Sequence, residues 1–314
     1  MAIVTGAGRG IGRAVAMLLA QEGASVVVND LGGAVDGRNS SKTPAGKVVT
    51  EIHSCGGSAI ADYNSVANFD ESAKIVKKAI DAFGRIDILC NAAGIIRDRM
   101  IFNMTEEEWD SVINVHLYGA FNMVRNSIPH MRNQGYGRIV LFSSSSGLGS
   151  IGQSNYASAK EGLVGFAKSL SRELATVGIT VNAVYPIAST RMMATLPENT
   201  LRRLESQRQL TGVAIGPAEM TASPEPKEAL SAENNAPKIA YLCSEGSGEI
   251  TGQVIGTGGW TMSLFSERHP TKSIHKNGLW TLDELEQLVP ISLAAGLINP
   301  SPAESPSRSR KRQN

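Results

Sequence analysis

The sequence predicts an α/β fold, a doubly wound sheet of parallel strands with helices on both faces, in a single domain with a C-terminal extension. Two observations carry this prediction. Short runs rich in Val and Ile alternate with longer segments of helical period, which is the pattern of βαβ units. Several of these runs are apolar throughout, as strands covered on both faces are. The 314 residues are enough for one large domain.

The elements follow from these runs in chain order. The expected strands, each a short β-branched or apolar run, cover 2–4, 25–29, 58–61, 86–90, 138–142, 180–184 and 253–257. The expected helices, in which apolar residues recur three or four positions apart, cover 13–22, 45–54, 71–83, 106–132, 155–176 and 237–242. Because strands and helices alternate, consecutive strands are expected to be parallel.

Charge and cysteine content exclude several classes of protein. Lys and Arg number 30 and Asp and Glu 29, so the basic footprint of a nucleic-acid-binding protein is missing and no nucleic acid partner is expected. Cys55, Cys90 and Cys243 are widely spaced, which fits reduced thiols better than disulfides or a zinc site. No secretory leader and no apolar run of ~18–20 residues is seen, so no membrane location is expected.

Histidines give no sign of a metal site. The five of them are scattered without metal-ligand spacing, so no metal is expected. His116 is expected to pack on the helix 106–132 and not to act in catalysis.

A glycine-rich turn joins the first strand to the first helix. It reads Thr-Gly-Ala-Gly-Arg-Gly-Ile-Gly over 5–12. Its glycines let the backbone turn tightly and approach a ligand, while the first amides of the following helix face a bound phosphate. Because a strand, this turn, a helix and a second strand follow in order, the turn predicts the dinucleotide site of a Rossmann fold.

Asp30, at the end of the second strand, decides between two cofactors. A carboxylate there accepts hydrogen bonds from both hydroxyls of the adenosine ribose and repels a 2′-phosphate, so NAD is favoured over NADP. Arg9 lies in the turn and can meet a 2′-phosphate, which keeps NADP as the alternative. Alternatively, Asp30 has only a structural role in the turn that ends the second strand and binds no ligand.

Tyr156 and Lys160 form the second chemical signal. Positions i and i+4 share a helix face, so the phenol and the ammonium point into one cleft. A nearby cation favours the phenolate, so the pair can pass a proton to or from a substrate oxygen. The serines at 143–146 end the fifth strand and can orient that oxygen with a hydroxyl. Alone, Tyr-x-x-x-Lys also occurs in helices by chance.

Together these motifs resemble the short-chain dehydrogenase/reductase superfamily over about residues 1–260. The matching set is Thr-Gly-x-x-x-Gly-x-Gly at 5–12, Asn-Ala-Ala-Gly at 91–94, Asn114, the serines at 143–146 and Tyr-x-x-x-Lys at 156–160. Segments 28–33, 94–99, 115–117 and 188–192 are similar to the (3R)-hydroxyacyl-CoA dehydrogenase domain of peroxisomal multifunctional enzymes. Segment 278–284 is similar to the extension of those domains, and Thr281 with Glu284 predicts a capped helix start.

The resemblance implies a role for each matching residue. Tyr156 would be the general acid/base, Lys160 would lower its pKa and hold the nicotinamide ribose, and Ser144 would bind the substrate oxygen. Asn114 would join a proton relay through a water held by its helix backbone. The implied cofactor-binding residues are Gly6, Arg9, Gly10, Ile11 and Gly12 at the pyrophosphate, Asp30 at the adenosine ribose, Ser65 and Val66 at the adenine, Ala92 and Gly94 at the ribose, and Ala188, Ser189 and Thr190 at the carboxamide.

Two serines compete for the catalytic position. The superfamily's usual interval, counted back from Tyr156, gives Ser143, whereas aligning the preceding strand forward gives Ser144. We prefer Ser144, because the residues that follow it then align directly.

The organisation of the chain follows from the resemblance and, for the lid and the tail, from composition. Residues 1–260 are expected to form the NAD(P)-binding catalytic domain with a substrate lid at 191–236, followed by the extension at 261–300 and a disordered basic tail at 301–314. The superfamily's helices near 105 and 154 imply a homodimer or homotetramer. The cytoplasm or peroxisomes are the expected location, although the sequence does not end in serine-lysine-leucine.

The predicted function is NAD(P)-dependent interconversion of a secondary alcohol and a ketone by hydride transfer. A 3-hydroxyacyl thioester is the first substrate expected, and a ketone of a specialised biosynthetic pathway is the alternative. A non-catalytic nucleotide-binding scaffold is the alternative of another class, against which the intact Ser-Tyr-Lys set argues.

Overall fold

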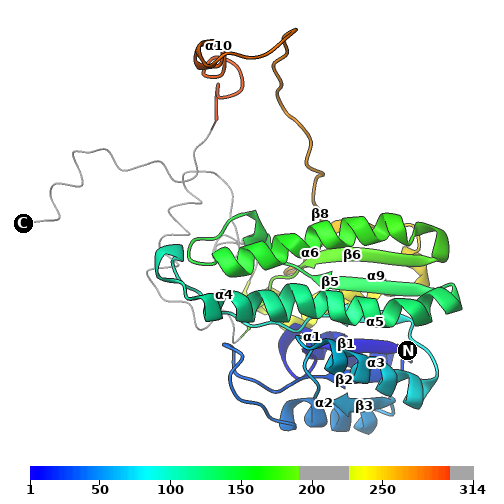
Figure 1. Cartoon of the computed structure of the whole chain (residues 1–314). Helices are drawn as coiled ribbons and strands as arrows, with labels where there is room; N and C mark the ends of the chain where they lie inside the picture. Colours follow the sequence, from blue (N-terminus) through cyan, green and yellow to red (C-terminus); the bar gives the residue numbers. More distant parts are fainter. Residues whose placement is uncertain (191–225, 298–314) are drawn as a thin grey trace, which may run out of the picture.

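One sheet of eight strands organises the chain (Figure 1). Its strands are β1 (Ala2–Thr5), β2 (Val26–Asn29), β3 (Ala59–Asp62), β4 (Ile88–Asn91), β5 (Gly137–Phe142), β6 (Ile179–Tyr185), β7 (Val254–Gly256) and β8 (Ser263–Leu264). They lie in the order β3-β2-β1-β4-β5-β6-β7-β8, all parallel except β8, which is antiparallel to β7. The computed structural model describes residues 1–190 and 226–297. The predicted doubly wound sheet is confirmed.

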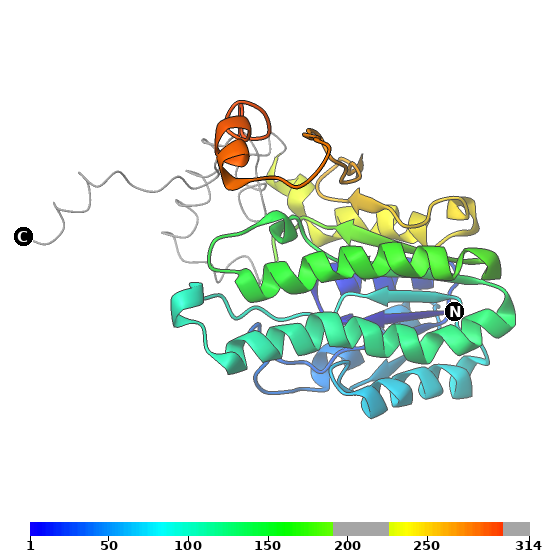
Figure 2. The same cartoon turned by 45° about the horizontal axis from the view of Figure 1, so that its top comes forward.

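Helices cover both faces of this sheet, as Figures 1 and 2 show. The α-helices are α1 (Gly10–Gln21), α2 (Thr43–Ser54), α3 (Phe69–Phe83), α4 (Glu106–Ile113), α5 (Gly119–Gln134), α6 (Ser154–Glu173), α9 (Ala236–Leu242) and α10 (Leu282–Leu288). Side chains of α1, α2 and α9 enter one buried cluster, and those of α3, α5 and α6 enter a second. Successive residues of β1 alternate between them, Val4 in the first and Ile3 in the second. The apolar strands are thus buried from both sides.

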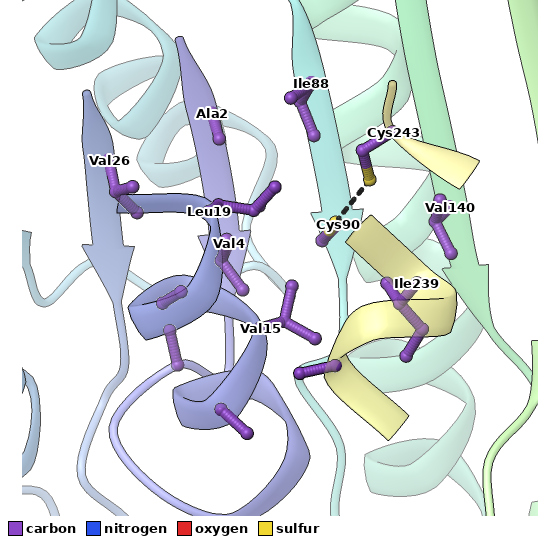
Figure 3. Packing of buried hydrophobic residues seen from close by; sticks show 14 of the residues in the cluster. Ala2, Val4, Val15, Leu19, Val26, Ile88, Cys90, Val140, Ile239 and Cys243 are labelled. Carbon is purple, nitrogen blue, oxygen red and sulfur yellow. Dashed lines mark hydrogen bonds between the residues drawn. The ribbon is translucent and has the colours of Figure 1, made fainter. Parts of the chain in front are cut away.

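In the first cluster, α1 and α9 pack on the central strands (Figure 3). Val15 of α1 and Ile239 of α9 are fully buried there. Cys90 on β4 and Cys243 after α9 bring their sulfur atoms to 3.5 Å as free thiols. The hydrogen bond between them and burial raise the pKa of the Cys90 thiol. Both cysteines therefore pack as small apolar side chains.

The helix predicted over 106–132 is interrupted. A capping box of Thr105 and Glu108 starts α4, and a π-helical turn, Asn114–Tyr118, separates α4 from α5. Such a turn carries an extra residue, so the side chains after it are rotated about the helix axis. As a result Asn114 is exposed, whereas His116 is buried.

The extension begins in β8 and ends in α10. Its predicted capping box is present: Thr281 Oγ1 accepts from the Glu284 amide at 3.2 Å, and Glu284 accepts from the Thr281 amide at 2.8 Å. Of the lid expected at 191–236, the structure describes only 226–236, and the tail at 301–314 lies outside the described residues. Across 1–190 and 226–297, no helix is long and apolar enough to cross a bilayer.

Candidate functional site

A cavity of about 600 Å³ lies where the parallel strands end and their loops begin. It lies at the point where the strand order reverses, between β1 and β4, which is where α/β sheets bind ligands. All the residues predicted to bind the cofactor line it, namely Gly6, Arg9, Gly10, Ile11, Gly12, Asp30, Ser65, Val66, Ala92, Gly94, Ala188, Ser189 and Thr190. Ser144, Tyr156 and Lys160 line the same cavity. The fold therefore gathers both predicted sets of residues in one place.

The glycine-rich turn has no room for side chains at two positions. Gly6 has a φ of 63°, and a Cβ on it would lie 2.8 Å from the Ala93 backbone. A Cβ on Gly12 would lie 2.4 Å from the Gly6 carbonyl oxygen. The turn is thus packed against the loop after β4, with the start of α1 in the cavity wall.

Replacing Gly6 by Ala is expected to lower the free energy of unfolding by about 2–5 kcal/mol. An L side chain in the left-handed region costs ~1–2 kcal/mol, and forcing atoms into a packed site costs ~1–3 kcal/mol. Urea denaturation measures the loss. Gly165→Ala in α6 is the matched control and should not destabilise, because a Cβ there meets no atom within 4 Å. Equal stability of Gly6→Ala and the wild type would contradict this account of the turn.

Asp30 is fixed beside the turn by two backbone amides. Its Oδ2 accepts from the Gly8 amide at 2.8 Å, and its Oδ1 accepts from the Gly32 amide at 2.6 Å. An ionised carboxylate has about four acceptor positions, so about two are left for donors in the cavity. Arg9 is also engaged, since its Nη1 donates to the Gly33 carbonyl at 3.1 Å. A carboxylate held in this way suits the two hydroxyls of an unphosphorylated ribose.

These features fit a nicotinamide dinucleotide. The closely packed glycines provide a turn that a pyrophosphate can approach, and the cavity has the volume of a typical cofactor site. Within the part of the chain that the structure describes, no group of three or more His, Cys, Asp or Glu is placed to hold a metal ion.

Tyr156 and Lys160 lie one turn apart near the start of α6. The Lys160 ammonium is 5.3 Å from the centre of the Tyr156 ring and donates to the Phe142 carbonyl at the end of β5. The Ser144 hydroxyl faces Tyr156 closely enough to lower the pKa of that phenol. The phenol, the ammonium and one serine hydroxyl therefore meet at the cavity, as the spacing predicts.

Burial governs the ionisation of both groups. It raises the pKa of Tyr156, an effect that the hydrogen bond from Ser144 opposes and the charge of Asp98 reinforces. Burial also lowers the pKa of Lys160 to about 7. The lowering of the Tyr156 pKa expected from Lys160 is not found in the protein without cofactor, where burial has the largest effect. Tyr156 is a phenol at neutral pH, which is the form that can give a proton to a carbonyl oxygen.

Replacing Lys160 by Met is expected to raise the free energy of unfolding by up to about 5 kcal/mol below pH 7, because the lowering of its pKa corresponds to ~1.4 kcal/mol per pH unit. Folding lowers the Lys160 pKa from 10.5 to about 7, so between these values the unfolded chain binds more protons. The stability of the wild type therefore rises with pH across this window. The buried Lys160 charge destabilises the fold to its full extent below pH 7 and no longer does so above pH 10.5.

Urea unfolding of Lys160→Met and the wild type at a series of pH values measures this difference. It should shrink steadily from pH 7 towards 10.5. A difference that is the same at every pH would contradict the assigned desolvation.

The two candidate serines have different surroundings. Ser143 is 2% exposed, and its hydroxyl donates to the Lys160 carbonyl at 2.5 Å, which ties β5 to α6. Ser144 is half-buried, accepts from the Ser146 amide at 3.1 Å and faces Tyr156. This geometry favours Ser144 as the residue that meets a substrate.

Asn114 does not line the cavity. Its side chain is exposed, and the π-helical turn brings His116 to the cavity wall instead. The His116 ring, 2% exposed, meets the Tyr156 ring edge to face with centroids 5.1 Å apart. The water that the resemblance assigns to Asn114 would be held by its helix backbone, so the exposure of the side chain does not test that role, which stays a prediction. Apolar periodicity does not mark a π-helical turn, so the sequence could not have located it.

Asp98 and Gln153 were not predicted as site residues. Gln153 lines the cavity just before α6 and donates to Asp98 Oδ2 at 2.8 Å. Burial raises the pKa of Asp98 to about 6 against the opposing effect of that hydrogen bond. Both residues lie within a few positions of a recognised motif, and this proximity is the one signal that could have found them.

Comparisons with known proteins agree with this geometry. A family model described as short chain dehydrogenase matches residues 1–200. Peroxisomal multifunctional enzyme type 2 of Drosophila melanogaster is 40% identical over 270 residues, which are 85% of this chain and 40% of that enzyme, so the chain spans less than half of it. A 3-oxoacyl-[acyl-carrier-protein] reductase of Staphylococcus aureus is 38% identical over 259 residues, 82% of this chain and 96% of that protein.

A solved structure agrees as well. The crystal structure of a short chain dehydrogenase from Mycobacterium avium matches with a TM-score of 0.77 and 38% identity, over 93% of this chain and 94% of that one. The chain thus belongs to the short-chain dehydrogenase family and is an NAD(P)-dependent oxidoreductase.

Proposed function

We propose that the chain is an NAD-dependent oxidoreductase that interconverts 3-hydroxyacyl and 3-oxoacyl thioesters. One observation carries the catalytic part: Ser144, Tyr156 and Lys160 line the same cavity as Asp30 and the glycine-rich turn. The substrate class is supported by likeness. The name of the S. aureus relative gives it a 3-oxoacyl group on an acyl carrier protein, and four segments of this chain resemble hydroxyacyl-CoA dehydrogenase domains.

In the proposed reduction, the substrate carbonyl oxygen accepts hydrogen bonds from Ser144 and Tyr156. The nicotinamide, when bound, supplies the hydride for the carbonyl carbon. Tyr156 gives its proton to the oxygen as negative charge develops there. The Lys160 ammonium then stabilises the phenolate. In the oxidative direction, Tyr156 takes the proton of the alcohol.

We also propose a homodimer or homotetramer formed through α4, α5 and α6. Two aromatic side chains near this helix layer are exposed, Tyr118 by 56% and Phe121 by 45%, which fits a surface covered by a second copy. Light scattering in solution should give the mass of two or four chains. A single-chain mass at high protein concentration would reject this part.

The substrate proposal is tested by the rates of NADH and NADPH oxidation with acetoacetyl-CoA and with a panel of ketones that lack a thioester. The expected result is the highest kcat/KM with acetoacetyl-CoA and NADH. Faster turnover of a ketone without a thioester would favour the alternative substrate, a ketone of a specialised biosynthetic pathway. If NADH binds but no carbonyl is turned over, the non-catalytic scaffold is favoured.

A further inference from the structure

Asn155, the residue before Tyr156, is fully buried in the first turn of α6 and does not line the cavity. A buried side-chain amide destabilises a fold unless it is hydrogen-bonded. Its Nδ2 donates to the carbonyl oxygens of Arg97 and Glu108, both at 3.0 Å. Its Oδ1 accepts from the Tyr156 amide at 2.8 Å. Both N–H groups of the side chain are therefore used, and exchanging its oxygen with its nitrogen would break all three bonds.

The bond to the Tyr156 amide takes the place of the usual N-terminal cap of α6. This amide is among the first four of the helix, which have no acceptor within it. At the starts of α3 and α4, the corresponding amide donates to the N-cap side chain, Asn68 or Thr105. The N-cap of α6, Gln153, accepts no such bond. The Tyr156 backbone is instead held by a side chain that is attached to two other parts of the chain.

Both carbonyls that Asn155 binds belong to segments with supports of their own. Glu108 closes the capping box that starts α4, and its carboxylate accepts from Arg99 Nε at 2.8 Å. The Arg97 side chain is only 14% exposed, and its Nε donates to the Asp36 carbonyl at 2.9 Å. The amide of Asn155 thus connects the start of α6 to two anchors that do not belong to α6.

The position of the Tyr156 backbone decides where its phenol lies in the cavity wall. The ring contacts His116 edge to face, with centroids 5.1 Å apart, and the phenol faces Ser144. A general acid must lie within ~2.6–3.2 Å of the atom that takes its proton. A displacement of ~1 Å can lower a rate ~10²-fold. A contact that holds this backbone can therefore affect the reaction without touching the substrate.

We propose that Asn155 is a positioning residue, which holds the phenol of Tyr156 in place for proton transfer by tying the first turn of α6 to the loop after β4 and to α4. The proposal rests on the proposed function for the reaction in which Tyr156 takes part. Asn155 neither gives nor takes a proton, and its side chain lies outside the cavity lining.

Asn155→Ala is expected to lower kcat about 10- to 100-fold and to leave the KM for NADH within about twofold, because the glycine-rich turn is untouched. Asn182→Ala is the matched control. Asn182 is also fully buried, donates to the Ile250 carbonyl at 2.7 Å and accepts from the Gln253 amide at 3.0 Å, but lies on β6 outside the cavity lining. Urea unfolding should show a loss of stability in both variants, whereas kcat should fall only in Asn155→Ala. Equal kcat values in the two variants would overturn the proposal.

A double-mutant cycle separates positioning from a merely structural role. In the Tyr156→Phe background, adding Asn155→Ala should lower kcat less than about twofold, because no phenol is left to position. A structural residue would lower kcat by the same factor in both backgrounds, and that result would overturn the proposal. Asn155→Ser, which can restore at most one of the three bonds, takes the place of Asn155→Ala in the cycle if the latter does not fold. Any carbonyl that the wild type reduces serves as substrate.

Crystal structures of the wild type, Asn155→Ala and Asn182→Ala without cofactor give a readout that needs no turnover. The Tyr156 hydroxyl is expected to move by ~1 Å relative to Ser144 in Asn155→Ala and to stay in place in Asn182→Ala. An unmoved hydroxyl in Asn155→Ala would overturn the proposal. If the hydroxyl moves but the wild type reduces no carbonyl, the proposed function fails and the positioning contact stands.

Discussion

Replacing Tyr156 by Phe is expected to lower kcat about 10²- to 10⁴-fold, the range over which a positioned general acid contributes. Phe keeps the ring that contacts His116 and lies beside Lys160. It removes only the hydroxyl that Ser144 meets and that transfers the proton. The KM for NADH should change little, because the rest of the cavity wall is intact.

Steady-state rates with any carbonyl that the wild type reduces measure this effect. Tyr241→Phe is the matched control, because the Tyr241 ring on α9 is 46% exposed and does not line the cavity. If Tyr156→Phe turned over substrate at the wild-type rate, the phenol would have no part in the reaction.

Replacing Asp30 by Asn is expected to shift the cofactor preference from NADH towards NADPH. The amide retains one acceptor but loses the charge that repels a 2′-phosphate and binds two ribose hydroxyls. A hydrogen bond to a charged group contributes ~1.5–3 kcal/mol, so the KM for NADH should rise about 10- to 100-fold. The KM for NADPH should fall or stay the same.

The ratio of kcat/KM for the two cofactors, measured in the wild type and the variant, tests this expectation. Asp36→Asn is the control, since Asp36 lies in the same loop but outside the cavity lining. Its side chain pairs with Arg38 instead, at 3.5 Å. A wild type that prefers NADPH, or an Asp30→Asn variant with an unchanged ratio, would contradict the role given to Asp30.

Much of the fold could be predicted because its determinants are local. The apolar strands alternate with amphipathic helices. Within the 5–12 turn, Gly12 is required by its contact with the Gly6 carbonyl, whereas Gly6 is required by the more distant Ala93 backbone. The capping box at Thr281 could be predicted from the sequence for the same reason, since all its atoms lie within four consecutive residues. Parallel strands then end at one edge of the sheet, which places motifs far apart in the sequence around one cavity.

The remaining features depend on contacts that the sequence pattern does not encode. The π-helical turn at 114–118, from which Val115 and His116 line the cavity, interrupts a segment whose helical period looks continuous in the sequence. The sequence predicts that Lys160 lowers the pKa of Tyr156, whereas in the structure burial raises it and is its largest cause. Burial is a property of the whole cavity wall, so it becomes visible only in three dimensions.

The central claim is that this cavity transfers a hydride between a bound nicotinamide and a carbonyl carbon. A single-turnover experiment tests it most directly, with wild-type enzyme preloaded with NADH and mixed with acetoacetyl-CoA or a ketone of the panel. We expect the near-ultraviolet absorbance of the reduced nicotinamide to disappear as one equivalent of alcohol forms per bound NADH. NADH that is bound but stays reduced with every carbonyl would contradict the account.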